Sequence, residues 1–94
     1  MNEEIEVHCQ PASDGWSCRV RVGSGAHVTL YQVSVSRVEL ATYAPGAAEP
    51  SELVATSFAY LLEREPRESI LRRFAISEIE RCFPDYPAAI VRRL

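Results

Sequence analysis

The sequence predicts an α+β domain, in which a three-stranded antiparallel β-meander is followed by three to four helices packed on one face. Apolar and polar residues alternate in the first half of the chain, which is the pattern of half-buried strands. From residue 51 onward, apolar residues recur at helical spacing instead. A chain of 94 residues supports one hydrophobic core. We therefore expect a single small domain over residues 1–94, with the meander at 1–42 and the helical part at 50–94.

The first two strands are predicted over residues 5–9 and 16–22, where the alternation is strict. One register makes their inner faces wholly apolar, because a slip of one residue would bury charged side chains. This register sets Ile5 opposite Val22, Val7 opposite Val20 and Cys9 opposite Cys18. On the outer face it pairs Glu6 with Arg21 and His8 with Arg19.

The third strand is predicted in residues 28–40, after a turn at residues 23–27. Its inner residues continue the apolar face, with Tyr31 opposite Val20, Val33 opposite Cys18 and Val35 opposite Trp16. Val28 and Leu30 then point outward. The apolar phase shifts again at Val38 and Leu40, which predicts a bulge near Ser36 or a strand that bends around the domain edge.

Prolines divide the second half of the chain into helices. The longest helix is predicted over residues 51–65, because Pro66 disfavours helical geometry in the residue before it. A shorter helix is predicted from Pro66 onward, with Ile70, Leu71 and Phe74 directed inward.

Two further helical segments are predicted near the C-terminus. Ser77 and Glu80 form a capping-box pattern, which indicates a helix that ends before Pro84. Residues 88–94 are expected to add a last helical turn or two.

Residues 57–87, SFAYLLEREPRESILRRFAISEIERCFPDYP, carry the pattern LLEREP-x-ESIL and the pair Phe83-Pro84. This block resembles the C-terminal portion of a group of short uncharacterised bacterial proteins, and it covers about a third of the chain. The resemblance implies no activity and assigns no functional residues. It leads us to expect a complete small protein.

Charge does not favour binding to nucleic acids. The net charge is −3, all ten basic residues are arginines, and neither half of the chain is strongly basic. Two analogies keep a nucleic-acid-binding regulator as an alternative. The β-β-β-α order is similar to antitoxin domains of the HicB type, and residues 74–87 are similar to part of a helix-turn-helix repressor. In the second case, however, the recognition helix would expose Glu78 and Glu80, which repel phosphates.

We predict a cytoplasmic protein with thiol cysteines. The N-terminal sequence has no apolar segment typical of a signal peptide, and no apolar run is long enough to cross a bilayer. Cys9, Cys18 and Cys82 are then expected to be reduced, and their odd number argues against a disulfide framework. A metal site would have to combine these cysteines with His27. Because no C-x-x-C spacing occurs, we expect no metal and no cofactor.

No catalytic residue is predicted. The sequence GSG at residues 23–25 lies in a turn between strands and lacks the strand-to-helix context of a nucleophile elbow. The same turn lacks the following helix N-terminus that a phosphate-binding loop requires. We therefore expect a protein that is not an enzyme.

The outer face of the predicted sheet is the candidate partner surface. It carries His8, Arg19, Arg21 and Gln32, with Val28 and Leu30 at its margin, and is suited to an acidic protein or RNA. The free edge of the third strand offers a second surface, where a symmetry mate would extend the sheet. The sequence thus predicts a small non-catalytic protein-interaction or regulatory module, expected to be a homodimer.

Overall fold

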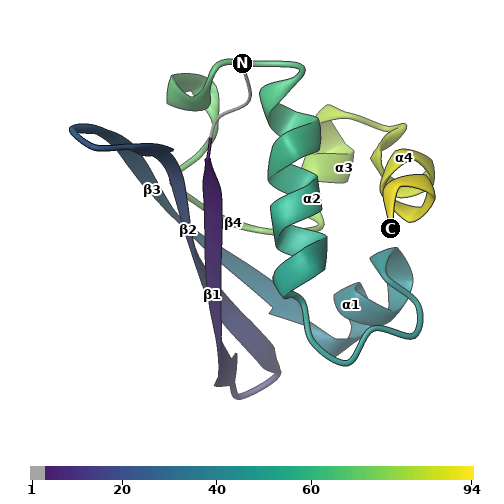
Figure 1. The fold of residues 1–94 in the computed structure, drawn as a ribbon. Coiled ribbons are helices and arrows are strands. Elements are labelled where there is room, and N and C mark those ends of the chain that lie inside the picture. The colour runs from purple at the N-terminus through teal and green to yellow at the C-terminus, as the bar shows by residue number, and fades with distance from the viewer. Residues whose placement is uncertain (1–3) are drawn as a thin grey trace.

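The computed structural model describes residues 4–94 as one four-stranded sheet with helices on one side (Figure 1). The strands lie in the order β1-β2-β3-β4. In chain order the elements are β1 (Ile5–Ala12), β2 (Gly15–Ser24), β3 (His27–Ser36), α1 (Arg37–Tyr43), α2 (Ser51–Leu62), the 3-10 helix η1 (Arg67–Ser69), β4 (Arg73–Ala75), α3 (Glu78–Cys82) and α4 (Tyr86–Arg93). The predicted α+β class is confirmed.

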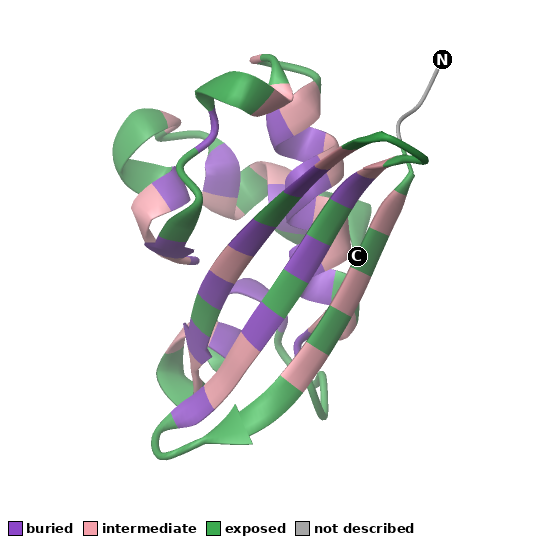
Figure 2. Ribbon diagram, turned by 90° about the vertical axis from the view of Figure 1, so that its left-hand side faces the viewer, coloured by how far each residue is buried: buried purple, intermediate pink, exposed green. Residues whose placement is uncertain are grey.

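The antiparallel meander β1-β2-β3 has the predicted register throughout. Val7 pairs with Val20 and Cys9 with Cys18 across the first ladder. In the second ladder, Val20 pairs with Tyr31, and the pairs of Cys18 with Val33 and Trp16 with Val35 follow. Buried and exposed residues alternate along β2 and β3, as Figure 2 shows on the outer face. The alternation of apolar residues therefore specifies the pairing.

The third strand ends at Ser36, and the predicted bulge or bend beyond it is wrong. Ser36 is the N-cap of α1: its hydroxyl accepts from the Glu39 N–H at 3.0 Å. The Glu39 carboxylate in turn accepts from the Ser36 N–H at 2.8 Å. This capping box starts a helix in which Leu40 and Tyr43 are buried at helical spacing. The shift in apolar phase marks a change from strand to helix.

The predicted helix after Pro66 is mostly wrong, because only the short η1 forms there. The chain then extends and β4 pairs with β3 in parallel, setting Phe74 beside Val33. The Gln32 N–H donates to the carbonyl of Arg72 at 2.7 Å, and the Ile76 N–H donates to Ser34 at 3.0 Å. Phe74 is buried as expected, whereas Leu71 is 63% exposed and does not point inward.

The remaining helices follow the prediction with shifted ends. The helix predicted over residues 51–65 ends at Leu62, and a turn leads to Pro66. Ser77 makes no side-chain cap, so the predicted capping box at α3 is wrong. The Glu78 carboxylate accepts from the Ala75 N–H at 2.8 Å instead. The segment predicted over residues 88–94 is helical and begins earlier, at the start of α4.

The core lies between the inner face of the sheet and the helices (Figure 1). Helix α2 contributes Phe58 and Leu61 to it, as the apolar pattern predicted. The Phe58 ring lies 4.9 Å from Tyr31 on β3 and 6.0 Å from Phe74 on β4, measured between ring centroids. Aromatic contacts thus join α2 to both strands. No helix found between residues 4 and 94 is long and apolar enough to span a membrane.

Candidate functional site

Three of the predicted partner-surface residues lie in one row across the outer face of the sheet. His8 on β1 pairs with Arg19 on β2, which pairs with Gln32 on β3. The pairing of β3 with β4 places Arg73 beside Gln32 and completes the row. Because residues paired across a sheet project from the same face, these four side chains share the outer surface. With neighbouring strands about 4.8 Å apart, the row is about 14 Å long.

Arg21, the fourth predicted residue, lies in the adjacent row with Glu6 on one side and Leu30 on the other. Its Nε is 4.0 Å from the Glu6 carboxylate, so part of its charge is compensated. Leu30 is 54% exposed and adds an apolar contact to the same face. Val28 is half-buried beside Gly23.

Two arginines that the sequence analysis did not assign to this surface join it through the segment around β4. Arg72 and Arg73 lie in the segment for which the sequence predicts a short helix from Pro66 onward. In the structure, Arg73 belongs to the row, and Arg72 lines the same depression as Arg19, Gln32 and Arg73. The alternation of Phe74 and Ile76 with polar or small residues was the available signal for a strand, but it is very short.

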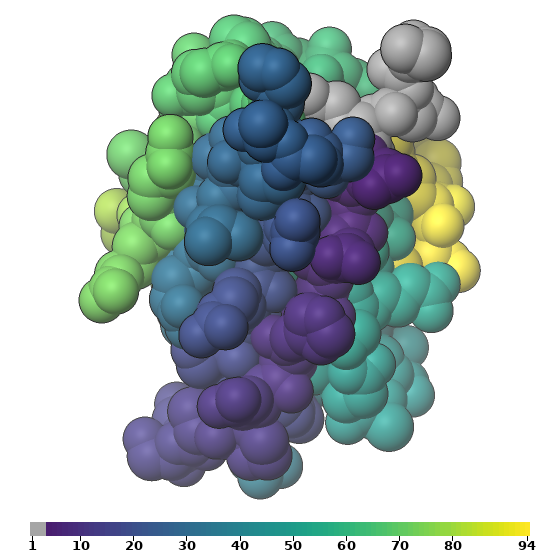
Figure 3. Space-filling model, turned by 60° about the vertical axis from the view of Figure 1, so that its left-hand side comes forward, coloured from purple at the N-terminus to yellow at the C-terminus, as the bar shows by residue number. Residues whose placement is uncertain are grey.

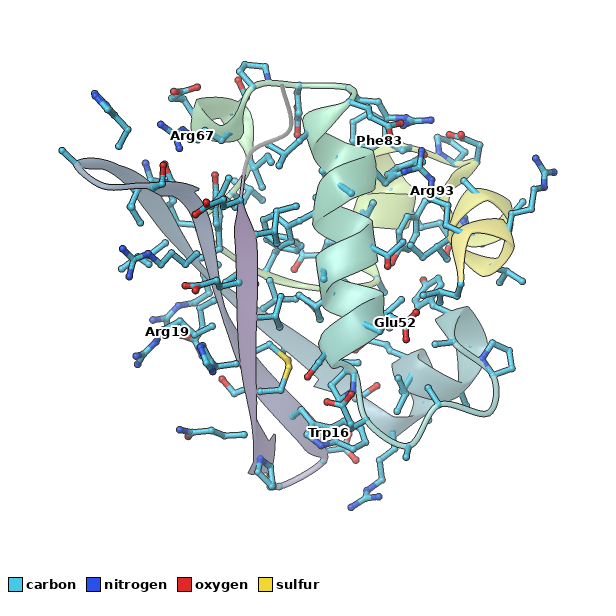
Figure 4. The ribbon with its side chains drawn as sticks, viewed as in Figure 1. Trp16, Arg19, Glu52, Arg67, Phe83 and Arg93 are labelled. Atoms are coloured by element: carbon cyan, nitrogen blue, oxygen red, sulfur yellow. A yellow bond between two sulfur atoms is a disulfide. The ribbon has the colours of Figure 1, made fainter. Side chains whose placement is uncertain are left out.

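We call His8, Arg19, Arg21, Gln32, Arg72 and Arg73 the cationic face. Figure 4 shows Arg19 pointing away from the helices, and Figure 3 shows the strands of this face side by side. Between residues 4 and 94, no carboxylate lies within 4.0 Å of the guanidinium groups of Arg19, Arg72 or Arg73. All three side chains are exposed. Their charge therefore faces solvent without a neutralising partner from the described chain.

Two shallow depressions flank Arg19 on the cationic face. The larger, about 350 Å³, is lined by Arg19, Leu30, Tyr31, Gln32, Arg72 and Arg73. The smaller, about 100 Å³, is lined by His8, Gln10, Ser17, Arg19 and Gln32. The Gln32 amide donates to the Ser17 hydroxyl. This hydrogen bond fixes the orientation of the Gln32 side chain, which lines both depressions. The surface is contoured and offers donors to an anionic group.

The cysteines behind this surface correct the expectation of three thiols. Cys9 and Cys18 form a disulfide on the inner face of the sheet, with their Cα atoms 4.0 Å apart. The cause lies in the predicted register itself, which sets the two side chains opposite each other on one face. Cys18 is fully buried and Cys9 is half-buried. Cys82 is an exposed thiol in α3, on the helical side of the molecule.

The structure does not bring the candidate metal ligands together. Cys9 and Cys18 are bonded to each other, and His27 is exposed at the start of β3. In the part of the chain from residue 4 to residue 94, no group of three or more His, Cys, Asp or Glu side chains is arranged to hold a metal ion.

Helix α3 lacks the features of the recognition helix in a helix-turn-helix motif. It has only five residues, and the carboxylates of Glu78 and Glu80 are engaged by Ala75 and Tyr43. The helix-turn-helix analogy is therefore not supported by the local structure. A recognition helix needs an exposed face that can reach base edges.

The buried hydroxyl groups have structural partners. Tyr86 and Ser57 share a hydrogen bond of 2.7 Å, and Tyr60 donates to Asp85 at 3.0 Å. Burial raises the pKa of the Tyr86 hydroxyl above its usual value. No buried side-chain polar atom of the described residues lacks a hydrogen-bond partner.

A larger cleft of about 430 Å³ lies on the helical side, beside the start of α2. Apolar residues dominate its lining, including Leu53, Val91 and Leu94, and Glu52 contributes a charged side chain from α2 (Figure 4). The cationic face carries more charged and hydrogen-bonding side chains than this cleft does. Comparisons of the chain with protein-family models, curated proteins and solved structures found no match.

Proposed function

We propose that this protein is a non-catalytic binding module that takes up an acidic segment of a partner protein on its cationic face. The observation that carries the proposal is the row His8, Arg19, Gln32 and Arg73, to which each strand of the sheet contributes one residue. Guanidinium groups bind carboxylates through paired N–H donors, and the glutamine amide adds a neutral donor. The strands fix the spacing of the backbone positions from which these donors project, and the hydrogen bond to Ser17 orients the Gln32 amide before the partner arrives.

An acidic protein segment suits this surface better than a nucleic acid does. Proteins that bind single strands stack bases chiefly on aromatic side chains, and the outer-face positions of β1 to β4 in the described chain hold no Phe, Tyr or Trp, with His8 as their one ring. The exposed Leu30 side chain instead offers an apolar contact beside the arginines. The chain as a whole carries a net charge of −3, which disfavours long-range attraction to a nucleic acid most strongly, because its backbone carries a charge at every phosphate.

The expected homodimer and cytoplasmic location belong to this proposal. The third strand's edge is not free as the sequence analysis expected, because β4 pairs with residues Gln32, Val33 and Ser34 of β3. A homodimer formed along β3 would therefore be limited to the residues that β4 does not cover, and light scattering over a range of concentrations measures its mass. In a reducing cytoplasm, the Cys9–Cys18 disulfide would form only transiently.

A peptide-binding assay tests the proposed function. The probe is a fluorescently labelled peptide of alternating glutamate and leucine, and the same peptide with glutamine in place of glutamate is its control. The test variant combines Arg19→Glu with Arg73→Glu. The matched variant combines Arg81→Glu with Arg92→Glu, which changes the net charge equally but lies on exposed positions of α3 and α4.

We expect the cationic-face variant to raise the Kd for the acidic peptide by about tenfold or more, because like charges replace two attractive contacts. The α3 and α4 variant should leave the Kd nearly unchanged. The proposal fails if the acidic and glutamine peptides bind equally, or if both variants lose affinity alike. Tighter binding to single-stranded RNA than to the peptide would favour the nucleic-acid alternative instead.

A further inference from the structure

We propose that the Cys9–Cys18 disulfide is a reversible thiol–disulfide exchange site, which a dithiol reductant opens at the sulfur of Cys9. We further propose that its redox state controls the cationic face on the other side of the sheet. The proposal of an exchange site is argued from the disulfide alone. The proposal that its redox state controls the cationic face rests on the proposed function.

The two cysteine residues differ in burial, although both side chains lie on the inner face of the sheet. Cys18 lies on the central strand β2 and is fully buried. Cys9 lies on the edge strand β1 and is half-buried. Thiol–disulfide exchange requires that the attacking thiolate reach one sulfur along the S–S axis. Cys9 is therefore the sulfur that an external thiolate can reach, and Cys18 is the leaving group.

The fold is expected to persist without this bond, although Ile5, Val7 and Cys9 of β1 pack against the core. Strand β1 contributes no fully buried residue, whereas β2, β3 and the helices supply the core. The ladder between β1 and β2 runs over eight residue pairs and does not need the sulfurs. Once reduced, both cysteines remain small apolar side chains that suit their positions. Reduction can thus occur in the folded protein, as a reversible site requires.

Reduction of the Cys9–Cys18 disulfide by a dithiol proceeds in two steps. A thiolate of the reductant attacks the Cys9 sulfur, the Cys9–Cys18 bond breaks, and the Cys18 thiolate leaves and takes up a proton. The second thiol of the reductant then attacks the mixed disulfide and releases Cys9, which is protonated in turn. The protein gains two electrons and two protons, and the dithiol becomes a disulfide.

The disulfide lies directly behind one of the depressions on the cationic face. The chain neighbours of Cys9 are His8 and Gln10, and those of Cys18 are Ser17 and Arg19. His8 pairs with Arg19 and Gln10 pairs with Ser17, on either side of the cysteine pair. All four residues line the 100 Å³ depression. A covalent link between the two strands fixes their separation at this point. Reduction leaves that separation to the hydrogen-bonded ladder of an edge strand, where opening is easiest.

The experiment uses the full chain with Cys82→Ser, so that the paired cysteines are the only thiols. The protein is oxidised with glutathione disulfide and reduced with dithiothreitol, and the thiols are counted by alkylation and mass spectrometry. Circular dichroism checks the fold in both states. Hydrogen exchange of the β1 amides and the Kd for the Glu/Leu peptide are then compared between the two states.

A variant with Cys9→Ser and Cys18→Ala mimics the reduced state, because it cannot form the bond. Its Kd and its hydrogen exchange should match those of the reduced protein, with or without dithiothreitol. This variant separates the effect of the bond from any direct effect of the reductant.

We expect full and reversible reduction without loss of the circular dichroism signal, and alkylation of Cys9 before Cys18. Reduction should speed exchange of the β1 amides and raise the Kd by about fivefold. The exchange site is refuted if no disulfide forms under oxidation, if reduction unfolds the chain, or if Cys18 reacts as fast as Cys9. Unchanged β1 exchange refutes the control of the cationic face. If the oxidised protein does not bind the acidic peptide at all, the proposed function fails, while thiol counts and β1 exchange still decide on the redox site.

Discussion

Arg67 joins the short helix η1 to the β2–β3 hairpin by contacts that are very distant in the sequence. Its guanidinium donates to the carbonyl of Val22 at 3.1 Å and to that of His27 at 2.8 Å. The Tyr31 hydroxyl donates to the Arg67 carbonyl at 2.6 Å (Figure 4 labels Arg67). The guanidinium occupies the space beside Gly23, where a Cβ would meet it and the His27 carbonyl. Gly23 also has a φ of +105°, which side chains disfavour.

We predict that Gly23→Ala lowers the free energy of unfolding by about 1–3 kcal/mol, because the methyl group adds a clash to an unfavourable backbone conformation. Urea denaturation measures the change. Gly25→Ala is the matched control: Gly25 also has a positive φ, +61°, but its Cβ position is open. A smaller loss is expected there. Equal losses at the two positions would show that the contact with Arg67 is not the cause.

The α1 helix depends on one carboxylate that serves two segments. Glu39 accepts from the Ser36 N–H at 2.8 Å through one oxygen, which closes the capping box. Its other oxygen accepts from the Ser77 N–H at 3.2 Å and so ties the start of α1 to the loop before α3. The Glu39 carboxylate therefore stabilises the junction between the sheet and the C-terminal helices.

The loss of stability caused by a substitution in this capping box should increase with the number of backbone N–H groups that it leaves without an acceptor. We expect Ser36→Ala to cost about 1 kcal/mol, which is typical of a lost N-cap, and Glu39→Ala to cost more, about 2 kcal/mol. Thr42→Ala, which removes an exposed hydroxyl bond to the Val38 carbonyl within the same helix, is the control. Chemical denaturation gives the ranking. A smaller cost for Glu39→Ala than for Ser36→Ala would contradict the double role of Glu39.

Strand β4 is the element that the sequence pattern did not predict. It has three residues, and its pairing with β3 joins positions about forty residues apart in the chain. The local pattern around Pro66 is equally compatible with a short helix. Burial of Phe74 against Phe58 and the hydrogen bonds to β3 decide in favour of the strand. Such tertiary contacts routinely override local propensity.

At the scale of the whole molecule, a cluster of tyrosines joins the helices. The Tyr43 and Tyr86 rings lie 5.2 Å apart, and the Tyr60 and Tyr86 rings lie 5.5 Å apart. Tyr43 donates to the Glu80 carboxylate at 2.8 Å. Burial and this hydrogen bond raise the pKa of the Tyr43 hydroxyl to about 12, from its ordinary value near 10. The pKa of the Tyr60 hydroxyl is also raised, mainly by burial.

These shifts predict alkaline instability. A raised pKa in the folded state means that the unfolded chain releases its phenolic protons first, so stability falls as pH rises. The loss for Tyr43 should begin near pH 10 and be complete near pH 12. Thermal unfolding of the Cys82→Ser protein across this range measures it. The Tyr43→Phe variant should show a shallower decline, and an identical decline would exclude Tyr43 as a cause.

Much of the cationic face could be predicted, because it follows from the strand register. Once Val7 lies opposite Val20, the outer neighbours His8 and Arg19 must share a row. Gln32 joins them by the same logic in the second ladder. The capping box at Ser36 and Glu39 is also present in the sequence, but the apolar residues that follow it fit a continuing strand as well as a helix. Local patterns of this kind are ambiguous at the ends of elements.

The sequence by itself determined the β1-β2-β3 meander, its register and the opposition of Cys9 and Cys18, because alternating burial is a local property with one low-energy solution. Only the tertiary structure decided that the opposed cysteines are bonded and that Arg73 completes the row. Both outcomes depend on distances between atoms: the sulfurs must meet across the ladder, and β4 must be held beside β3 by packing against α2. A pattern of residue types along the chain carries no such distances.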